Sequence, residues 1–187
     1  MTTRQAGGAR VLVFNTGSSS LKLSVIGRDE SVAERCDIDR WDGSAGAGDL
    51  REFLGRLATS PDPPAAIGHR VVHGGSEFTA ATLIDDRVRA GIASLTPLAP
   101  LHQPRALAGI EAATTAFGGL PQVAFFDTAF HATLPPRAFT YPLPAVWRTT
   151  YGLRKFGFHG LSHEYASRRA AEMIQASDSQ LDRIVTC

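Results

Sequence analysis

The chain is poor in cysteine, in unbalanced charge and in long apolar runs, and each shortage excludes a class of protein. Cys36 and Cys187 are its only cysteines, too few for a disulfide framework, so both thiols are expected to be free. Lys and Arg number 19 and Asp and Glu 18, for a formal net charge of +1. This balance gives no overall field for nucleic acid or a membrane surface, so any phosphate affinity must be local.

No apolar run approaches the length of a transmembrane helix, and residues 1–10 are polar, without a stretch that resembles a signal peptide. Internal repeats and low-complexity tracts are missing as well. The 187 residues are 43% hydrophobic and 20% charged, which is typical of a globular protein with a buried core. We therefore expect a cytoplasmic protein that binds neither nucleic acid nor a membrane.

Alternating apolar and polar residues predict a β-hairpin near the start of the chain. Val11–Phe14 and Leu21–Ile26 are its strands, with a turn at Thr16–Ser20 that contains Gly17. Further strands are predicted at 31–36, 66–73 and 122–126, and helices at 49–58, 87–95, 104–117 and 161–175. A hairpin followed by alternating strands and helices indicates an α/β domain with a mixed sheet.

The remaining segments are expected to be less regular. We predict a loop at 127–136, an irregular stretch at 138–157 and the beginning of a strand at 184–186. Because the chain stops inside that last apolar run, we expect it to be a fragment of a longer protein. The domain boundary is expected between Pro142 and Lys155, which gives domains at 1–145 and 146–187.

Five segments place polar groups beside glycine or just past an apolar run, and together they suggest one site for an anionic ligand. In the first, Gly17 allows a ligand close to the backbone, while the hydroxyls of Ser18 and Ser20 and the charge of Lys22 could hold phosphate. Asn15 could donate to phosphate or hold a metal-bound water. The same segment, taken alone, also fits a serine-rich hairpin turn, and it lacks the spacing of a P-loop.

The other segments contain all six histidines. Arg70 lies on an apolar strand, where a half-buried guanidinium needs either an anion or a structural carboxylate as its partner. Asp127 follows a strand, where ligands collect in α/β sheets, although an Asx turn or cap is the alternative. His159 is expected in the loop before a helix that begins at 160–162, either as a donor to a charged oxygen or as a capped loop histidine. His69, His73 and His131 are expected to be structural.

Missing motifs argue against a zinc site and against a serine hydrolase. His159 and His163 have zinc-like spacing, but position 160 is Gly rather than Glu and no cysteine cluster supplies further ligands. A serine hydrolase is excluded because the chain has no G-x-S-x-G, and its clustered serines join two strands rather than a strand and a helix.

Four motifs, in this order and at these separations, are similar to those of the acetate kinases. They are N-T-G-S-S-S-L-K from Asn15, G-H-R-V-V-H-G-G from Gly68, F-D-T-A-F-H from Phe126 and F-G-F-H-G-L-S-H from Phe156. The resemblance implies a ribonuclease-H-like (actin-like ATPase) α/β domain with a mixed sheet, followed by the start of a second similar domain. It also implies a homodimer that converts ATP and acetate to ADP and acetyl phosphate with Mg²⁺.

The resemblance also implies a role for each matching residue. Asp127, Arg70 and His159 would be catalytic; Arg70, Val72, Leu101, His102 and Phe158 would bind the substrate; Ser18, Ser20 and Lys22 would bind the nucleotide phosphates; and Asn15 would assist the metal. Among the substrate residues, Val72, Leu101 and Phe158 would line a pocket for the methyl group.

Two positions depart from the family pattern: Gln103 replaces the usual Asn, and Leu161 replaces the usual Thr. Family members are longer than this chain, so a second active-site arginine, a metal-associated glutamate and most of the nucleotide-binding domain are expected to lie outside it. Two alternatives stay open: a propionate or butyrate kinase of the same group, and a non-catalytic fragment that binds acyl phosphate.

Overall fold

The computed structural model describes residues 9–44, 48–175 and 183–187, which form two compact units. The sheet unit comprises the described residues of 1–73 and 81–125. The helical unit comprises residues 74–80 and the described residues of 126–187. The domain boundary expected between residues 145 and 146 stays a prediction.

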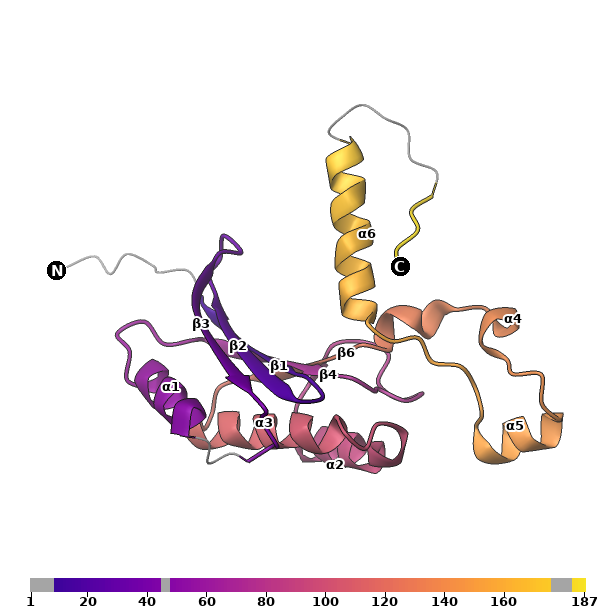
Figure 1. The fold of residues 1–187 in the computed structure, drawn as a ribbon, viewed down its shortest axis with the longest axis horizontal. Helices are drawn as coiled ribbons and strands as arrows, with labels where there is room; N and C mark the ends of the chain where they lie inside the picture. The colour runs from indigo at the N-terminus through magenta and orange to yellow at the C-terminus, as the bar shows by residue number, and fades with distance from the viewer. Residues whose placement is uncertain (1–8, 45–47, 176–182) are drawn as a thin grey trace. The chain divides into compact units, whose positions relative to one another are not determined.

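A six-stranded mixed sheet forms the sheet unit, in the order β3-β2-β1-β4-β6-β5 (Figure 1). The strands are β1 (Val11–Thr16), β2 (Ser20–Ile26), β3 (Val32–Asp39), β4 (Ala66–Val71), β5 (Thr82–Leu83) and β6 (Gln122–Phe126). β1, β2 and β3 form an antiparallel meander, whereas β4 runs parallel to β1. The predicted hairpin and the mixed sheet are confirmed. β5 was not predicted, because two residues are too few to show an alternating pattern.

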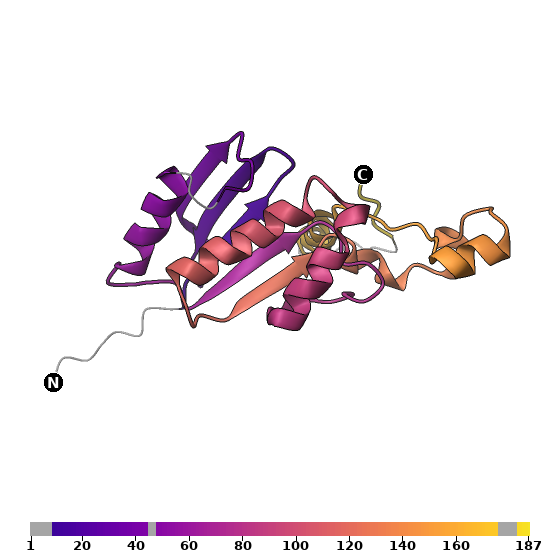
Figure 2. The same cartoon turned by 90° about the horizontal axis from the view of Figure 1, so that it is seen from below.

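Two helices, α1 (Gly48–Ala58) and α3 (Gln103–Ala116), cover one face of this sheet (Figure 2). The alternation of β1 sends Leu12 and Phe14 to that face, where they join one apolar core with Leu50 and Leu54 of α1. Each such side chain contributes about 1.5–3 kcal/mol to the free energy of folding when it is fully buried. Gly109 lets α3 come close to the strands, because a Cβ there would lie 3.4 Å from Phe14.

The other helices of the sheet unit are α2 (Asp86–Ser94), which packs on α3, and the 3-10 turn η1 (Thr96–Leu98). A polar chain fixes α3 to two strands. The Nε2–H of His69 donates to Gln122 Oε1 at 2.8 Å, and Gln122 Nε2 donates to Thr114 Oγ1 at 2.8 Å. Burial lowers the pKa of His69 to about 4, partly offset by its bond to Gln122, so the ring is neutral near pH 7. His69 therefore joins β4, β6 and α3 as a structural residue.

The helical unit contains η2 (Ala129–Thr133), α4 (Pro136–Phe139), α5 (Ala145–Tyr151) and α6 (Gly160–Gln175). The expectation of an irregular stretch at 138–157 was therefore wrong in part. α4 and α5 each start at or just after a proline, which suits the first turn of a helix, and Gly152 ends α5 at a φ of 60°. The sequence analysis did not predict these short helices, because a proline-rich composition indicates irregular structure.

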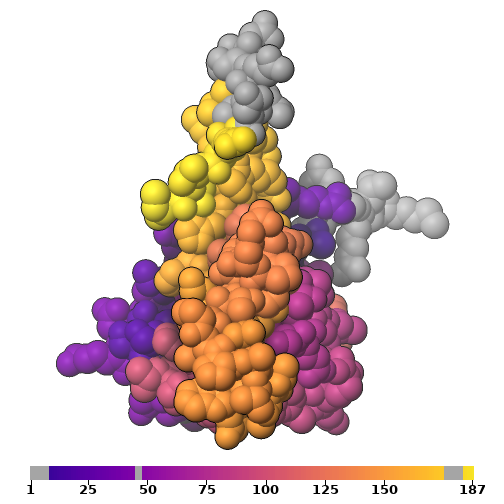
Figure 3. Space-filling view, turned by 90° about the vertical axis from the view of Figure 1, so that its right-hand side faces the viewer, coloured from indigo at the N-terminus to yellow at the C-terminus, as the bar shows by residue number. Residues whose placement is uncertain are grey.

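The strand expected at 184–186 is also absent, since residues 183–187 have no regular structure. A strand needs a neighbour to complete its hydrogen-bond ladder, and an apolar run does not supply one. The segment of α4 and α5 has a largely exposed surface, orange in Figure 3, on which Val146, Trp147 and Tyr151 are exposed. No helix among the described residues is both long and apolar enough to cross a membrane.

Candidate functional site

Strand register places three of the predicted residues side by side. Asn15 of β1 pairs with Lys22 of β2 on one side and with Arg70 of β4 on the other. Paired residues of adjacent strands project from the same face, about 4.8 Å apart. Arg70 Nη1 donates a hydrogen bond to Asn15 Oδ1 at 2.9 Å. We call Lys22, Asn15 and Arg70 the basic row; it lies on the face opposite to α1 and α3.

The serine turn lies at one end of this row, between β1 and β2. Its backbone is closed by a hydrogen bond from Gly17 N–H to the Ser20 carbonyl at 2.8 Å, and Trp41 N–H donates to the Ser19 carbonyl at 3.0 Å. A Cβ on Gly17 would lie 3.3 Å from the Ser20 oxygen, so the turn is tight. No hydrogen bond within the described residues uses the hydroxyls of Ser18 or Ser20. Both hydroxyls are therefore available to a ligand.

The start of α3 is held against the end of β4 by Gln103, which is fully buried. Its Nε2 donates to the His73 carbonyl at 3.0 Å and to the Ile92 carbonyl at 3.3 Å. The bond to His73 holds Leu101 and His102, which lie just before α3, near the end of the strand that carries Arg70. Gln103 is one of the departures from the family pattern, and its side chain has a structural role here.

The helical unit carries the other predicted residues, Asp127, Phe158 and His159. Asp127 is 1% exposed and directly follows β6. Its carbonyl accepts the Gly160 N–H at 2.8 Å, and a Cβ on Gly160 would lie 2.2 Å from that oxygen. Glycine at position 160 thus allows the start of α6 to lie against the residue after β6.

His159 lies immediately before α6, as predicted. Its carbonyl accepts the N–H groups of Ser162 and His163, each at 3.0 Å, so it occupies the capping position of the helix. Its φ of 55° lies in the left-handed region, which is uncommon for residues other than glycine. The imidazole is exposed, next to the exposed ring of Phe158.

His131, which we expected to be structural, holds this segment in place. Its Nε2–H donates to the Phe158 carbonyl at 3.0 Å, one residue before His159. The ring fills the space left by Gly157, where a Cβ would lie 2.3 Å from His131 Cγ. The sequence signal was the glycine beside Phe158, which marks a close approach but does not name the partner.

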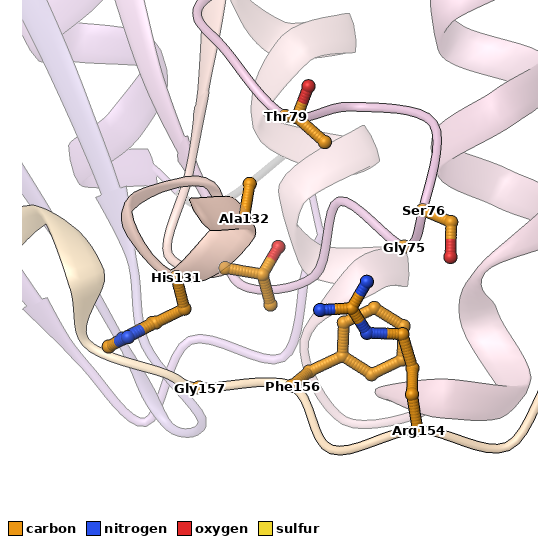
Figure 4. Close-up of a pocket in the computed structure, with 9 residues that line it drawn as sticks. Gly75, Ser76, Thr79, His131, Ala132, Arg154, Phe156 and Gly157 are labelled. Carbon is orange, nitrogen blue, oxygen red and sulfur yellow. The ribbon is translucent and has the colours of Figure 1, made fainter. Parts of the chain in front are cut away.

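A small hollow in the helical unit was not predicted as a site. It is lined by Gly75, Ser76, Thr79, Thr128, His131, Ala132, Arg154, Phe156 and Gly157 (Figure 4).

The residues predicted from the sequence to form the site fall into two groups, one in each unit. Asn15, Ser18, Ser20, Lys22, Arg70, Val72, Leu101 and His102 belong to the sheet unit, and Asp127, Phe158 and His159 to the helical unit.

Comparisons with known proteins agree on one family. The model of the acetokinase family matches residues 54–187. The acetate kinase of Pseudomonas aeruginosa is 45% identical over 185 residues, which cover 87% of this chain and 47% of the relative. That of Thermotoga maritima is 39% identical over 206 residues, which cover 95% and 51%. The chain thus spans about half the length of these relatives.

Solved structures give the same result and confirm the predicted fold. The acetate kinase of Porphyromonas gingivalis superposes with a TM-score of 0.75 at 31% identity, covering 90% of this chain and 49% of the other. A propionate kinase from Francisella tularensis superposes with a TM-score of 0.77 at 33% identity, covering 89% and 49%. The family match covers most of the chain, and the mixed sheet is shared with these kinases; this protein belongs to the acetokinase family.

Proposed function

We propose that this chain takes part in the reversible, Mg²⁺-dependent transfer of a phosphoryl group between ATP and acetate, which gives acetyl phosphate and ADP. The observation that carries the proposal is the basic row beside the serine turn. Two cations flank an amide on adjacent strands, and available hydroxyls follow at the strand end. Phosphoryl transfer depends mainly on positioning and on neutralising charge, which such a surface supplies.

In this reaction an acetate oxygen attacks the γ-phosphorus while the bond to the ADP oxygen breaks. We assign Arg70 and His159 to the negative charge on the equatorial oxygens, and Lys22, Ser18 and Ser20 to the phosphates. The bond from Arg70 to Asn15 supports this role, because it orients the guanidinium before a ligand arrives. Asp127 is assigned as the catalytic carboxylate.

A sparse metal site fits the residues that are present. The described part of the chain contains no group of three or more His, Cys, Asp or Glu side chains that could hold a metal. Mg²⁺ in kinases needs only one or two protein oxygens, since water and substrate phosphates complete its shell. Asn15 Oδ1 already accepts an N–H of the cationic Arg70, so we assign Asn15 a contact through water, with Asp127 as the other contributor. The bound metal would neutralise phosphate charge.

Val72, Leu101 and Phe158 are assigned to the methyl group of acetate, together with His102. Leu101 is 63% exposed and Phe158 41%, so each presents apolar surface to a ligand. One extra methylene changes binding in an apolar pocket by only about 1–3 kcal/mol, so propionate is a second candidate substrate. The similarity to a propionate kinase favours testing it. Comparison of kcat/KM for C2, C3 and C4 acids separates these activities.

We further propose that the protein acts as a cytoplasmic homodimer, with domains at 1–145 and 146–187. The exposed apolar side chains of α5 support self-association.

The function is tested by an ATP-dependent hydroxamate assay for acyl phosphate on the 187-residue chain, with acetate and Mg²⁺. Arg70→Ala is expected to lower turnover by at least about 100-fold, because it removes charge neutralisation in the transition state. Arg51→Ala, which removes an exposed arginine of α1, is the matched control and is expected to have no effect.

Equal turnover in the Arg70 variant and the wild type would show that its assigned role is wrong. If the wild-type chain forms no product, calorimetry with acetyl phosphate and with ATP is decisive. Binding without turnover would favour the non-catalytic fragment that binds acyl phosphate.

A further inference from the structure

The hollow in the helical unit is made by three segments that are distant in the sequence. The turn at 74–80 contributes Ser76 and Thr79, the region of η2 contributes Thr128, and the segment before α6 contributes Arg154 and Phe156. In Figure 4 the guanidinium of Arg154 lies against the ring of Phe156 at the edge of the hollow. The cavity measures about 40 Å³ and is open on one side. That volume admits a small ion but not a nucleotide.

Arg154 is a pre-positioned cation. Its guanidinium carbon lies 4.0 Å from the centroid of the Phe139 ring and 5.1 Å from that of Phe156. Stacking on aromatic faces restricts the side chain without using its N–H donors. Arg154 Nε donates weakly to the Lys155 carbonyl at 3.3 Å, and no carboxylate in the described ranges forms an ion pair with Arg154. Its two terminal nitrogens therefore remain to bind an anion.

Thr128 adds a buried donor. Its side chain lines the hollow although the residue is only 5% exposed, and its Oγ1 accepts the Gly74 N–H at 2.9 Å. A hydroxyl that accepts one hydrogen bond through oxygen keeps its own hydrogen to donate. Gly74 cannot be replaced without moving this turn, because a Cβ would lie 2.3 Å from the Phe78 carbonyl oxygen. The geometry of the donor is thereby fixed.

The remaining lining residues favour an anion as well. Ser76 and Thr79 bring two more hydroxyls at the exposed rim. None of the described residues that line the hollow is Asp or Glu, so none of them repels an anion or attracts a metal cation into it. The guanidinium and the hydroxyls offer more hydrogen-bond donors than the two oxygens of a carboxylate ligand can use. They suit the oxygens of a tetrahedral phosphate better.

We propose that this hollow is a binding site for a phosphate-type oxyanion, built around Arg154 and Thr128. Its residues all belong to the helical unit and differ from those of the basic row, which belong to the sheet unit. The proposal stands on the geometry of the hollow and does not require the proposed kinase function. Inorganic phosphate and the phosphoryl end of acetyl phosphate share the chemistry that the hollow would bind.

The test is an NMR titration of the 187-residue chain with inorganic phosphate. Saturable shifts are expected at the amides of Gly75, Thr79 and Gly157. Arg154→Gln should weaken phosphate binding at these amides by at least about tenfold, since a charge-assisted pair is lost. Arg168→Gln, which removes an exposed arginine of α6, is the matched control and should leave it unchanged.

Two further variants separate this site from folding defects and from the basic row. Ser76→Ala, at the exposed rim, should weaken binding by about two- to tenfold without affecting the fold. Arg70→Gln should leave the shifts at Gly75 and Gly157 intact, even if it abolishes kinase activity. The proposal is overturned if Arg154→Gln and Ser76→Ala both bind phosphate like the wild type, or if the shifts occur only in the sheet unit.

A parallel titration with acetyl phosphate identifies the source of the anion. Equal affinity for the two ligands would assign the hollow to free phosphate, whereas tighter binding of acetyl phosphate would assign it to the phosphoryl end of a larger molecule. Absence of shifts at the hollow with both ligands would refute the site.

Discussion

At the scale of single residues, burial decides what each histidine can do. His69 and His73 are 1% and 2% exposed, and burial lowers the pKa of both rings. His159, by contrast, is exposed beside α6, where its ring can meet a ligand. Four of the six histidines, His69, His73, His159 and His163, lie in glycine-containing motifs, so the sequence alone ranked them mainly by resemblance. The structure separates them by their access to solvent and by their partners.

The buried His69 makes stability depend on pH. Its folded-state pKa of about 4 lies below the ordinary 6.5, so the unfolded chain binds the proton more readily in that range. Stability is therefore expected to fall as the pH drops from 6.5 to 4. Each pKa unit is worth about 1.4 kcal/mol, so His69 accounts for about 3 kcal/mol of this loss. Urea denaturation at several pH values measures it.

The control for this effect is His69→Gln, which does not titrate but can donate a hydrogen bond through its amide. Between pH 6.5 and 4, the free energy of unfolding of this variant should fall by about 3 kcal/mol less than that of the wild type. His73 still contributes to the pH dependence in both proteins. An identical pH dependence in the two proteins would contradict the assignment.

At the scale of elements, two glycines let the segment before α6 pack closely on the segment after β6. Gly160 donates its N–H to the Asp127 carbonyl, and Gly157 makes room for the ring of His131. Both contacts fix the backbone on either side of His159. Helix periodicity predicted where α6 starts but not what it touches, since its contacts lie about thirty positions earlier in the chain.

Replacing Gly160 with Ala should therefore destabilise the helical unit. The added Cβ would lie 2.2 Å from the Asp127 oxygen, so the helix start must move and the hydrogen bond must break. We expect a loss of at least about 2 kcal/mol in the free energy of unfolding, which thermal or urea denaturation would detect.

The matched control is another Gly→Ala substitution, and its effect on the free energy of unfolding should have the opposite sign. Gly55 lies inside α1, where an added Cβ would meet nothing within 4 Å. Gly55→Ala is expected to stabilise the chain by about 0.5–1 kcal/mol through helix propensity. Equal effects at positions 55 and 160 would mean that the Gly160 contact does not matter.

At the scale of the whole molecule, the surface of α5 is unusually apolar. Val146 is 63% exposed, Trp147 53% and Tyr151 71%. Trp147 and Tyr151 are four residues apart and so share one side of the helix. An exposed apolar cluster of this kind marks a surface for association, which agrees with the proposed homodimer.

Trp147→Lys should therefore lower the average mass in sedimentation experiments at a fixed protein concentration. Leu98→Lys, which changes an exposed apolar residue of η1, is the control and should leave the mass unchanged. A monomeric wild-type chain, or association that is unaffected by Trp147→Lys, would show that α5 is not the interface.

The sequence by itself determined the mixed sheet, the bounds of β6 and the start of α6, because these depend on the alternation and spacing of neighbouring residues. It also pointed to the basic row and to Asp127 and His159 through motifs. The tertiary structure decided the short strand β5, the helices α4 and α5, and the hollow around Arg154. The bond from Arg70 to Asn15 joins residues 55 positions apart, and that from Gln103 to His73 joins residues 30 apart. Such contacts follow from strand register and helix packing, which bring together side chains that no local pattern connects.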